Sequence, residues 1–227
     1  MKRGFKKILV FSPHPDDDVI GCGGSIALHA QRGREVEVVY VTSGDAGSLK
    51  HGPKELSRIR EKEARQAAAV LGVKRVDFLR MQDGYVEANA ASIRTVVRLI
   101  RERQPDAVYI PHERDGHRDH RRTHEFVKEA VFRAFGPWFR DCGKTPWAVR
   151  AVLCYEVWTP LEEFSYVEDI TGVMKAKMEA LGRHASQIGP VSYADGVEGL
   201  NRFRGVMTGK GQYCECFKVL HTEGVIE

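Results

Sequence analysis

The sequence predicts an α/β protein with a mostly parallel β-sheet and helices on both faces. Short β-branched runs alternate along the chain with longer stretches of helical spacing, and strands that alternate with helices in this way form parallel βαβ units. The 227 residues, of which 42% are hydrophobic, suffice for one core that buries about 70% of the unfolded surface. We therefore expect residues 1–227 to fold as a single domain.

The expected strands are short runs rich in Val, Ile and Tyr, such as KILVF and EVEVVYVT. β-branched and aromatic residues are typical of strands because they pack well on a pleated surface. The strands are expected at residues 7–11, 35–42, 76–79, 107–110, 148–155 and, last in the chain, 213–220.

The expected helices lie between these runs, where good helix formers recur at helical spacing. They are expected at residues 24–31, 53–71, 89–104 and 119–135, with a shorter helical stretch near 174–183. The chain beyond residue 169 is less regular than the part before it.

The charge balance excludes some classes of protein. There are 35 Lys and Arg against 31 Asp and Glu, a net charge of +4, whereas proteins that coat nucleic acids carry a larger and clustered basic excess. The basic start MKRGFKK is followed by four apolar residues before a polar loop. A secretory signal needs about 7–15 apolar residues there and a membrane span about 20. We expect a cytoplasmic protein with no nucleic-acid partner and no membrane span.

The five cysteines are an odd number and form no CxxC pair. This pattern is typical of reduced thiols in a cytosolic protein rather than of a disulfide framework or a zinc ribbon. We therefore expect none of them to be a metal ligand.

The most unusual polar residues follow the first and the fourth expected strands. Open parallel sheets bind ligands just beyond the carboxyl ends of their strands, so these two loops should meet there. An imidazole and three carboxylates facing several imidazoles predict a metal site. The loops contain His14, Asp16, Asp17 and Asp18 on one side, and His112, His117, His120 and His124 on the other. The pattern alone leaves open which aspartates and which of these histidines bind the metal.

Two of these segments resemble the motifs of a known family. His14-Pro15-Asp16-Asp17 is similar to the AHPDDE motif of the LmbE-like (PIG-L) zinc-dependent N-acetylglucosaminyl deacetylases, and His117-Arg118-Asp119-His120 to their HPDH motif. The resemblance extends over nearly the whole chain. Weaker matches lie at Arg60, Glu63, residues 71–72 and 83–84, Asp169, Lys177 and residues 184–187. It implies a Rossmann-like, LmbE-like fold.

The resemblance also implies a set of site residues. His14, Asp17 and His120 would bind Zn²⁺ or another divalent transition metal. Three protein ligands leave a position for water, whose pKa falls towards about 7 on zinc.

The remaining roles that the resemblance implies are catalytic and substrate-binding. Asp16 would be the general base, His117 would face the developing oxyanion, and Asp119 would orient His117 and favour its protonated form. Arg60 and Asp83 would contact the sugar. The implied partner is a small N-acetylated amino sugar or its conjugate, and the implied assembly is a homo-oligomer such as a trimer or hexamer.

The motifs depart from the family pattern at three positions. Pro13 replaces the usual Ala, Asp18 the usual Glu, and Arg118 the usual Pro. None of these positions is an implied metal ligand, so the departures affect the shape of the loops rather than the ligand set.

Four alternative functions fit the sequence less well or equally well. A dinucleotide-binding domain is disfavoured because Gly21–Gly24 lacks the GxGxxG spacing and three aspartates occupy the phosphate position. A phosphohydrolase would need more basic loops. A sugar-binding protein with a vestigial metal site is disfavoured by the intact set of His and Asp residues. An amidase of the same family that acts on a thiol conjugate would use the same ligands and stays open.

Overall fold

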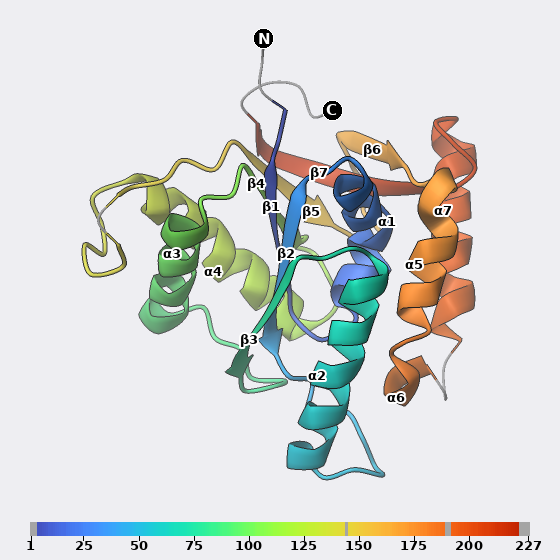
Figure 1. Cartoon of the computed structure of the whole chain (residues 1–227), viewed down its shortest axis with the longest axis horizontal. Helices are drawn as coiled ribbons and strands as arrows, with labels where there is room; N and C mark the ends of the chain where they lie inside the picture. Colours follow the sequence, from blue (N-terminus) through green and yellow to red (C-terminus); the bar gives the residue numbers. More distant parts are fainter. Residues whose placement is uncertain (1–3, 144, 189–191, 223–227) are drawn as a thin grey trace.

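The computed structural model describes residues 4–143, 145–188 and 192–222, and its centre is a seven-stranded sheet with the order β3-β2-β1-β4-β5-β7-β6 (Figure 1). Strands β1 to β5 pair in parallel, whereas β7 runs antiparallel to both β5 and β6. The strands are β1 (Lys7–Ser12), β2 (Glu35–Thr42), β3 (Arg75–Met81), β4 (Ala107–Pro111), β5 (Ala151–Tyr155), β6 (Tyr166–Asp169) and β7 (Cys214–Thr222). The prediction of a mostly parallel α/β sheet is confirmed.

Helices cover both faces of this sheet, as Figure 1 shows. Helices α3 and α4 pack on one face, while α1, α2, α5 and α7 contribute to the core on the other. The helices are α1 (Asp17–Gln31), α2 (Pro53–Val70), α3 (Ala90–Arg103), α4 (Arg118–Phe135), α5 (Met174–Leu181), α6 (Ala185–Ile188) and α7 (Tyr193–Thr208), with a 3₁₀ turn at Thr171–Val173.

The strands supply both cores by alternation. Along β1, Ile8 and Val10 belong to the core under α1, whereas Leu9 and Phe11 belong to the core under α3 and α4. Successive side chains of a strand point to opposite faces of the sheet, so a continuous apolar run such as KILVF serves two hydrophobic layers.

The first helix begins earlier than predicted. The sequence placed it at 24–31, but α1 starts at Asp17 and includes a non-helical residue, Cys22, at a kink. The glycines lie inside the helix because there is no room for side chains. A Cβ on Gly21 would lie 2.3 Å from the Tyr155 ring, and one on Gly24 would lie 2.6 Å from Ile170. The start of the helix therefore carries Asp17 directly to the end of β1.

Other boundaries also differ from the prediction. β5 begins at Ala151 rather than at residue 148, and neither β6 nor α7 was predicted. The expected last strand exists as β7, but it is antiparallel. No helix among the described residues is long and apolar enough to cross a membrane. All five cysteines are buried and none forms a disulfide.

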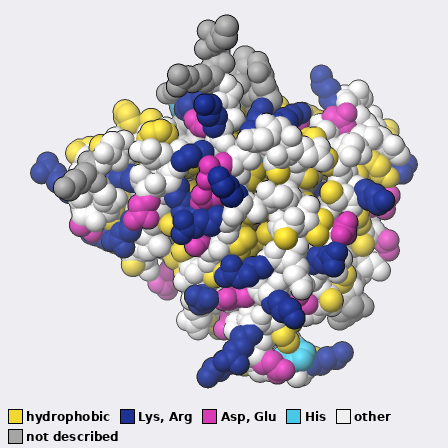
Figure 2. All heavy atoms as spheres, in the orientation of Figure 1, with side chains coloured by type: hydrophobic (Ala, Val, Ile, Leu, Met, Phe, Trp, Pro, Cys, Tyr) yellow, Lys and Arg dark blue, Asp and Glu magenta, His cyan; other side chains and the backbone are white. Residues whose placement is uncertain are grey.

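The face of the molecule seen in Figure 2 carries basic, acidic and apolar side chains in a mixture. Charges of both signs are interspersed on this face.

Candidate active site

The two polar loops meet at one edge of the sheet because β1 and β4 are direct neighbours. Ile8 pairs with Ala107 and Val10 with Tyr109 in a parallel register, so both strands end at the same edge. The chain then enters α1 at Asp17 and α4 at Arg118. The first turns of these two helices therefore face each other across the ends of β1 and β4.

Three donor atoms from these loops form a nearly equilateral triangle. His14 Nδ1 lies 3.0 Å from Asp17 Oδ2 and 3.2 Å from His120 Nε2, and Asp17 Oδ2 lies 3.1 Å from His120 Nε2. All three residues are buried. Of the loop residues, the structure thus brings together the set that the family resemblance implied.

This triangle fits a divalent transition metal. Zinc bound tetrahedrally at about 2.0–2.2 Å from each ligand sets its ligand atoms about 3.3 Å apart, close to the separations seen here. Two imidazole nitrogens and one carboxylate oxygen are ligands that zinc prefers. The second carboxylate oxygen of Asp17, Oδ1, is buried and has no hydrogen-bond partner among the described residues, which leaves it free to contact a cation.

The electrostatic surroundings also favour a cation. Burial lowers the pKa of His120, but the carboxylates of Asp17 and Asp115 outweigh this effect and raise the pKa to about 9. The pKa of His14 is likewise raised, because Asp119, Asp17 and Asp83 outweigh its burial. The buried carboxylates around His14 and His120 therefore favour a positive charge between them, which a bound cation would supply.

Each candidate ligand histidine has a carboxylate behind it. His14 Nε2 lies 3.1 Å from Asp83 Oδ1 and 3.4 Å from Asp119 Oδ2, and His120 Nδ1 lies 3.1 Å from Asp115 Oδ1. Carboxylates in this position fix the tautomer and the orientation of a metal-ligating imidazole. The arrangement leaves Nδ1 of His14 and Nε2 of His120 for the metal.

Asp115 belongs to this site but to neither family motif, although it lies in the second polar loop. Its Oδ1 also accepts a hydrogen bond from His117 N, and its Oδ2 accepts from the backbone N–H groups of Trp158 and Thr159. The one signal in the sequence is a carboxylate two residues before His117. Its partners after β5 are more than 40 residues away, so spacing could not reveal them.

Asp119 and His117 are placed differently from the implied arrangement. The Asp119 carboxylate accepts hydrogen bonds from Gly84 N and Val86 N and faces His14. His117 instead accepts a hydrogen bond on Nδ1 from the backbone N–H of Asp119, as the N-cap of α4. Burial, followed by the charges of His14 and His120, lowers the pKa of His117, so its neutral form is favoured rather than the expected cation.

Asp16 directly precedes Asp17 of the triangle and contacts Arg60. Its φ of 156° is rare for a residue other than glycine, and its Oδ1 lies 3.2 Å from Arg60 Nη2. Burial raises the pKa of Asp16 to about 6, with Arg60 opposing the rise and Asp17 adding to it. A carboxylate with such a pKa is suited to exchange protons near neutral pH.

The two implied sugar contacts border the same site. Arg60 is buried and donates hydrogen bonds to Gly44 O and Pro15 O, so it joins two loops at the sheet edge. Asp83 accepts a hydrogen bond on Oδ2 from Ala46 N. Both side chains thus have structural partners, and their contact with a sugar stays a prediction.

His184 is a further buried group near this site. Both of its ring nitrogens lack hydrogen-bond partners among the described residues, and burial together with the charge of Arg60 lowers its pKa to about 3. His184 is therefore a neutral imidazole.

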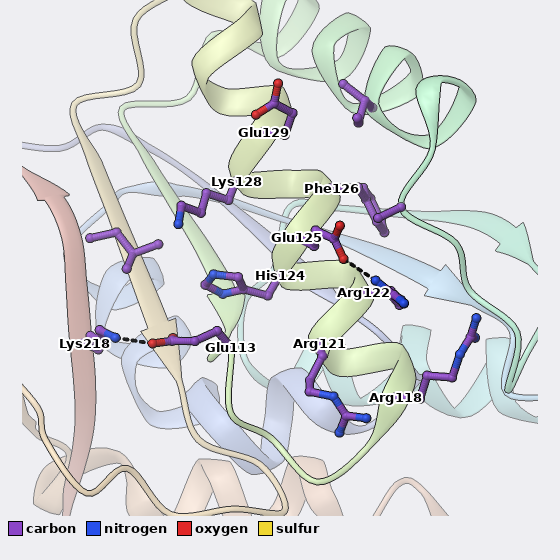
Figure 3. A pocket seen from close by; sticks show the side chains of 13 residues that line it. Glu113, Arg118, Arg121, Arg122, His124, Glu125, Phe126, Lys128, Glu129 and Lys218 are labelled. Atoms are coloured by element: carbon purple, nitrogen blue, oxygen red, sulfur yellow. Dashed lines mark hydrogen bonds and ion pairs between the residues drawn. The ribbon is translucent and has the colours of Figure 1, made fainter.

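A second group of potential ligands lies behind the loop, beside a cavity of about 960 Å³ over α4 (Figure 3). Glu113, His124 and Cys154 place donor atoms within 4.8 Å of one another. The ammonium group of Lys218 already pairs with the Glu113 carboxylate (Figure 3), and His124 Nδ1 lies 3.0 Å from Pro111 O. His124 therefore serves the scaffold, as a backbone contact to the end of β4.

The chain is similar in sequence to proteins named as deacetylases. The chain is 32% identical to the diacetylchitobiose deacetylase of Thermococcus kodakarensis over 80% of this chain and 70% of that protein. It is 27% identical to a 1D-myo-inositol 2-acetamido-2-deoxy-alpha-D-glucopyranoside deacetylase of Rhodococcus jostii over 81% and 82% of the two chains.

The fold is also similar to that of solved structures. The N,N'-diacetylchitobiose deacetylase of Pyrococcus horikoshii, solved with an inhibitor, superposes with a TM-score of 0.88 at 30% identity, covering 95% of this chain and 84% of that one. A 4-carboxy-2-hydroxymuconate hydratase, GalB of Pseudomonas putida, also superposes with a TM-score of 0.84 at 24% identity over 97% and 98%. The fold by itself therefore does not decide the reaction.

The family follows from the sequence match. The PIG-L family, described as GlcNAc-PI de-N-acetylase, matches residues 9–131, which include both loops of the buried His and Asp triangle. The chain belongs to the PIG-L family.

Proposed function

We propose that this protein is a metal-dependent deacetylase that hydrolyses the N-acetyl group of an N-acetylglucosamine-type sugar or its conjugate. The observation that carries the proposal is the buried triangle of His14, Asp17 and His120 with Asp16 beside it. Relatives that match about four fifths of the chain are named as deacetylases of such sugars. Both named substrates contain a second ring beside the acetylated sugar.

The triangle would hold the metal through His14 Nδ1, Asp17 Oδ2 and His120 Nε2. When bound, zinc would supply an activated water and polarise the acyl oxygen of the substrate. The carboxylates of Asp83, Asp119 and Asp115 lie 3.1–3.4 Å from the outer nitrogens of the two imidazoles and would orient them in the loaded protein. Because these contacts exist within the protein alone, the ligand geometry is preorganised.

Asp16 is the residue that we assign as the general base, because it is next to Asp17 in the chain and its pKa is raised. It takes the proton of the attacking water on its carboxylate and returns a proton to the leaving amine. A pKa of about 6, raised chiefly by burial, lets one group do both near neutral pH. Arg60 holds the carboxylate in place through its Nη2.

His117 is suited to donate a hydrogen bond to the developing oxyanion. Its Nδ1 accepts from Asp119 N, so the neutral ring carries its proton on Nε2. The ring lies 4.8 Å from that of His14 and 4.9 Å from that of His120. A neutral donor replaces the protonated imidazole that the family resemblance implied.

Replacement of His117 separates its role from metal binding. In His117→Ala we expect zinc to bind as in the wild type and the turnover number to fall about 10²–10³-fold, as is typical when one oxyanion donor is lost. His51→Ala is the matched control, because His51 lies on the surface and pairs with Glu55. Normal turnover in a His117→Ala protein with intact metal binding would remove His117 from the mechanism.

The proposed function is tested by measuring acetate release. The zinc-loaded protein is incubated with N-acetylglucosamine, N,N'-diacetylchitobiose, an N-acetylglucosaminyl inositol and an amide-linked thiol conjugate. We expect acetate from at least one of the sugars and a large loss of rate in Asp16→Asn. Zinc-loaded protein that releases acetate from none of the sugars would contradict the proposal, and cleavage of the thiol conjugate alone would assign the amidase activity instead.

A further inference from the structure

We propose that Trp158, supported by Tyr193, forms an aromatic platform at the rim of the site that stacks against the second ring of the substrate. The proposal deepens the proposed function and rests on it, because it assigns the part of the protein that would recognise the ring beside the acetylated sugar. It concerns residues outside both motifs of the family.

Trp158 is tied to the metal-site loop through a shared carboxylate. The backbone N–H of Trp158 donates to Asp115 Oδ2 at 2.9 Å, while Asp115 Oδ1 lies 3.1 Å from Nδ1 of His120. One carboxylate therefore connects the segment that follows β5 to a candidate metal ligand. Trp158 lies at the same edge of the sheet as the triangle.

The neighbouring residue fixes the same segment a second time. Thr159 Oγ1 accepts a hydrogen bond from Gly116 N at 2.9 Å, and Thr159 O lies 2.7 Å from Nε2 of His112. Gly116 directly precedes His117. The backbone that carries Trp158 is thus held against the loop that carries the proposed oxyanion donor.

The indole side chain is exposed but supported on one side. Trp158 is 42% exposed, and its ring lies 5.2 Å from that of Tyr193, tilted by 51°. Tyr193 is the first residue of α7. The contact between the two rings limits the motion of the indole, so that the Trp158 side chain would lose little conformational entropy when a ligand binds.

An indole of this kind matches the chemistry of a sugar ring. A pyranose presents an apolar face of C–H groups and an edge of hydroxyl groups. The indole offers an apolar face for the first, and an N–H that donates to no described residue for the second. Ligand sites combine such aromatic surfaces with a few fixed polar groups, and here the metal triangle with Asp16 supplies the polar part.

The chain contains a matched control at another place. Trp138 is 39% exposed and its ring also contacts an aromatic ring, that of Phe132. It follows the end of α4, whereas the metal triangle uses the first turn of that helix. If Trp158 contributed only to packing or solubility, as Trp138 does, replacing either tryptophan by alanine would have the same effect on catalysis.

The test compares kinetic constants for substrates with one and two rings. Trp158→Ala, Trp158→Phe and Trp138→Ala are assayed with N-acetylglucosamine and N,N'-diacetylchitobiose after zinc content is confirmed. In Trp158→Ala we expect KM for the disaccharide to rise about tenfold, with kcat little changed, because a stacked ring contributes up to about 1.4 kcal/mol. KM for the monosaccharide should change little, Trp158→Phe should recover most of the loss, and Trp138→Ala should match the wild type.

Two results would overturn the platform. One is an unchanged KM for the disaccharide in Trp158→Ala. The other is an equal loss for both substrates, together with a fall in kcat or in zinc content, because this would show a structural role in holding the loop.

A binding measurement separates failure of the platform from failure of the proposed function. N,N'-diacetylchitobiose is titrated calorimetrically into the zinc-loaded Asp16→Asn protein and into the same protein with Trp158→Ala. Weaker binding in the second protein supports the platform even if the wild type releases no acetate. Equal binding, or no binding to either protein, overturns it.

Discussion

At the scale of single residues, the site depends on carboxylates that do not themselves reach the proposed metal position. Asp115 is the most connected of them: it contacts His120, accepts a hydrogen bond from His117 N and anchors the backbone of Trp158 and Thr159. It is fully buried. One side chain therefore contacts the segments that carry a candidate metal ligand, the proposed oxyanion donor and the proposed sugar platform.

Replacing Asp115 should weaken metal binding. Asp115→Asn keeps the size of the side chain but removes the charge behind His120, and losses of this kind typically lower metal affinity about 10–100-fold. Zinc affinity is measured by competition with a chromophoric chelator, with circular dichroism to confirm the fold. Asp106→Asn is the matched control, because Asp106 also accepts backbone hydrogen bonds, from Lys6 and Lys7, but before β4 at the opposite edge. Equal zinc affinities in the two variants would rule out this role for Asp115.

The residues of the triangle were predictable only through the family resemblance, because the pattern of polar residues left open which aspartates and histidines take part. The partners of those residues were not. Asp119 stands inside the second motif, yet its carboxylate turns to His14 and to the loop at Gly84. That choice depends on which backbone N–H groups the folded loop leaves unpaired, and the spacing of residues along the chain does not report it.

At the scale of elements, the start of α1 shows what a sequence pattern omits. Glu215 of β7 accepts hydrogen bonds from Gly24 N and Ser25 N just after the kink, and Lys177 pairs with it. These groups form a second helix cap within α1. The predicted start of the helix at residue 24 coincides with this cap. Glu215 lies about 190 residues further along the chain, so local sequence signals do not reveal that the helix extends back to Asp17.

The other end of α1 carries a titratable group that should make stability depend on pH. His29 Nε2 lies 2.9 Å from the Tyr109 hydroxyl. Burial, with the charges of Arg34 and Arg32, lowers the pKa of His29 to about 3, whereas an unfolded histidine titrates at about 6.5. Below pH 6.5 the unfolded chain binds a proton that the folded protein does not, so the free energy of unfolding falls with falling pH until about pH 3.

The comparison of His29→Gln with the wild type isolates this effect. Between pH 7.5 and pH 5.5 the wild type should lose about 1.4 kcal/mol more of its free energy of unfolding than the variant does. Urea denaturation at the two pH values, with chelator present so that metal binding does not contribute, gives the difference. Parallel losses in the two proteins would show that His29 takes up its proton equally in the folded and unfolded states.

At the scale of the whole molecule, the topology explains why distant segments meet. The neighbouring positions of β1 and β4 bring the two motifs together, and the strand order places β5 next to β4, so that the segment with Trp158 joins the same edge. The alternation of strands and helices predicted this sheet. The last strand was also predicted, but not that β7 runs antiparallel. Strand β6 and helix α7 were not predicted, the latter because the residues after 169 lack a regular pattern.

A bound metal should stabilise the folded protein as a whole. The unfolded chain does not hold His14, Asp17 and His120 together, so the metal binds the folded state preferentially. At a free zinc concentration 100 times the dissociation constant, the free energy of unfolding should rise by about 2.7 kcal/mol. Thermal denaturation with and without zinc measures the gain, and a gain that persists in Asp17→Asn would place the metal elsewhere.

Acetate release by this protein should depend on one metal ion held by the triangle. The direct measurement strips the protein with a chelator, adds zinc in steps, and records bound zinc and acetate release from N,N'-diacetylchitobiose in the same samples. We predict that the rate rises in proportion to bound zinc, reaches a plateau at about one ion per chain, and stays near zero in Asp17→Asn. Full acetate release by the stripped protein, or an Asp17→Asn protein that keeps both the zinc and the rate, would contradict the account.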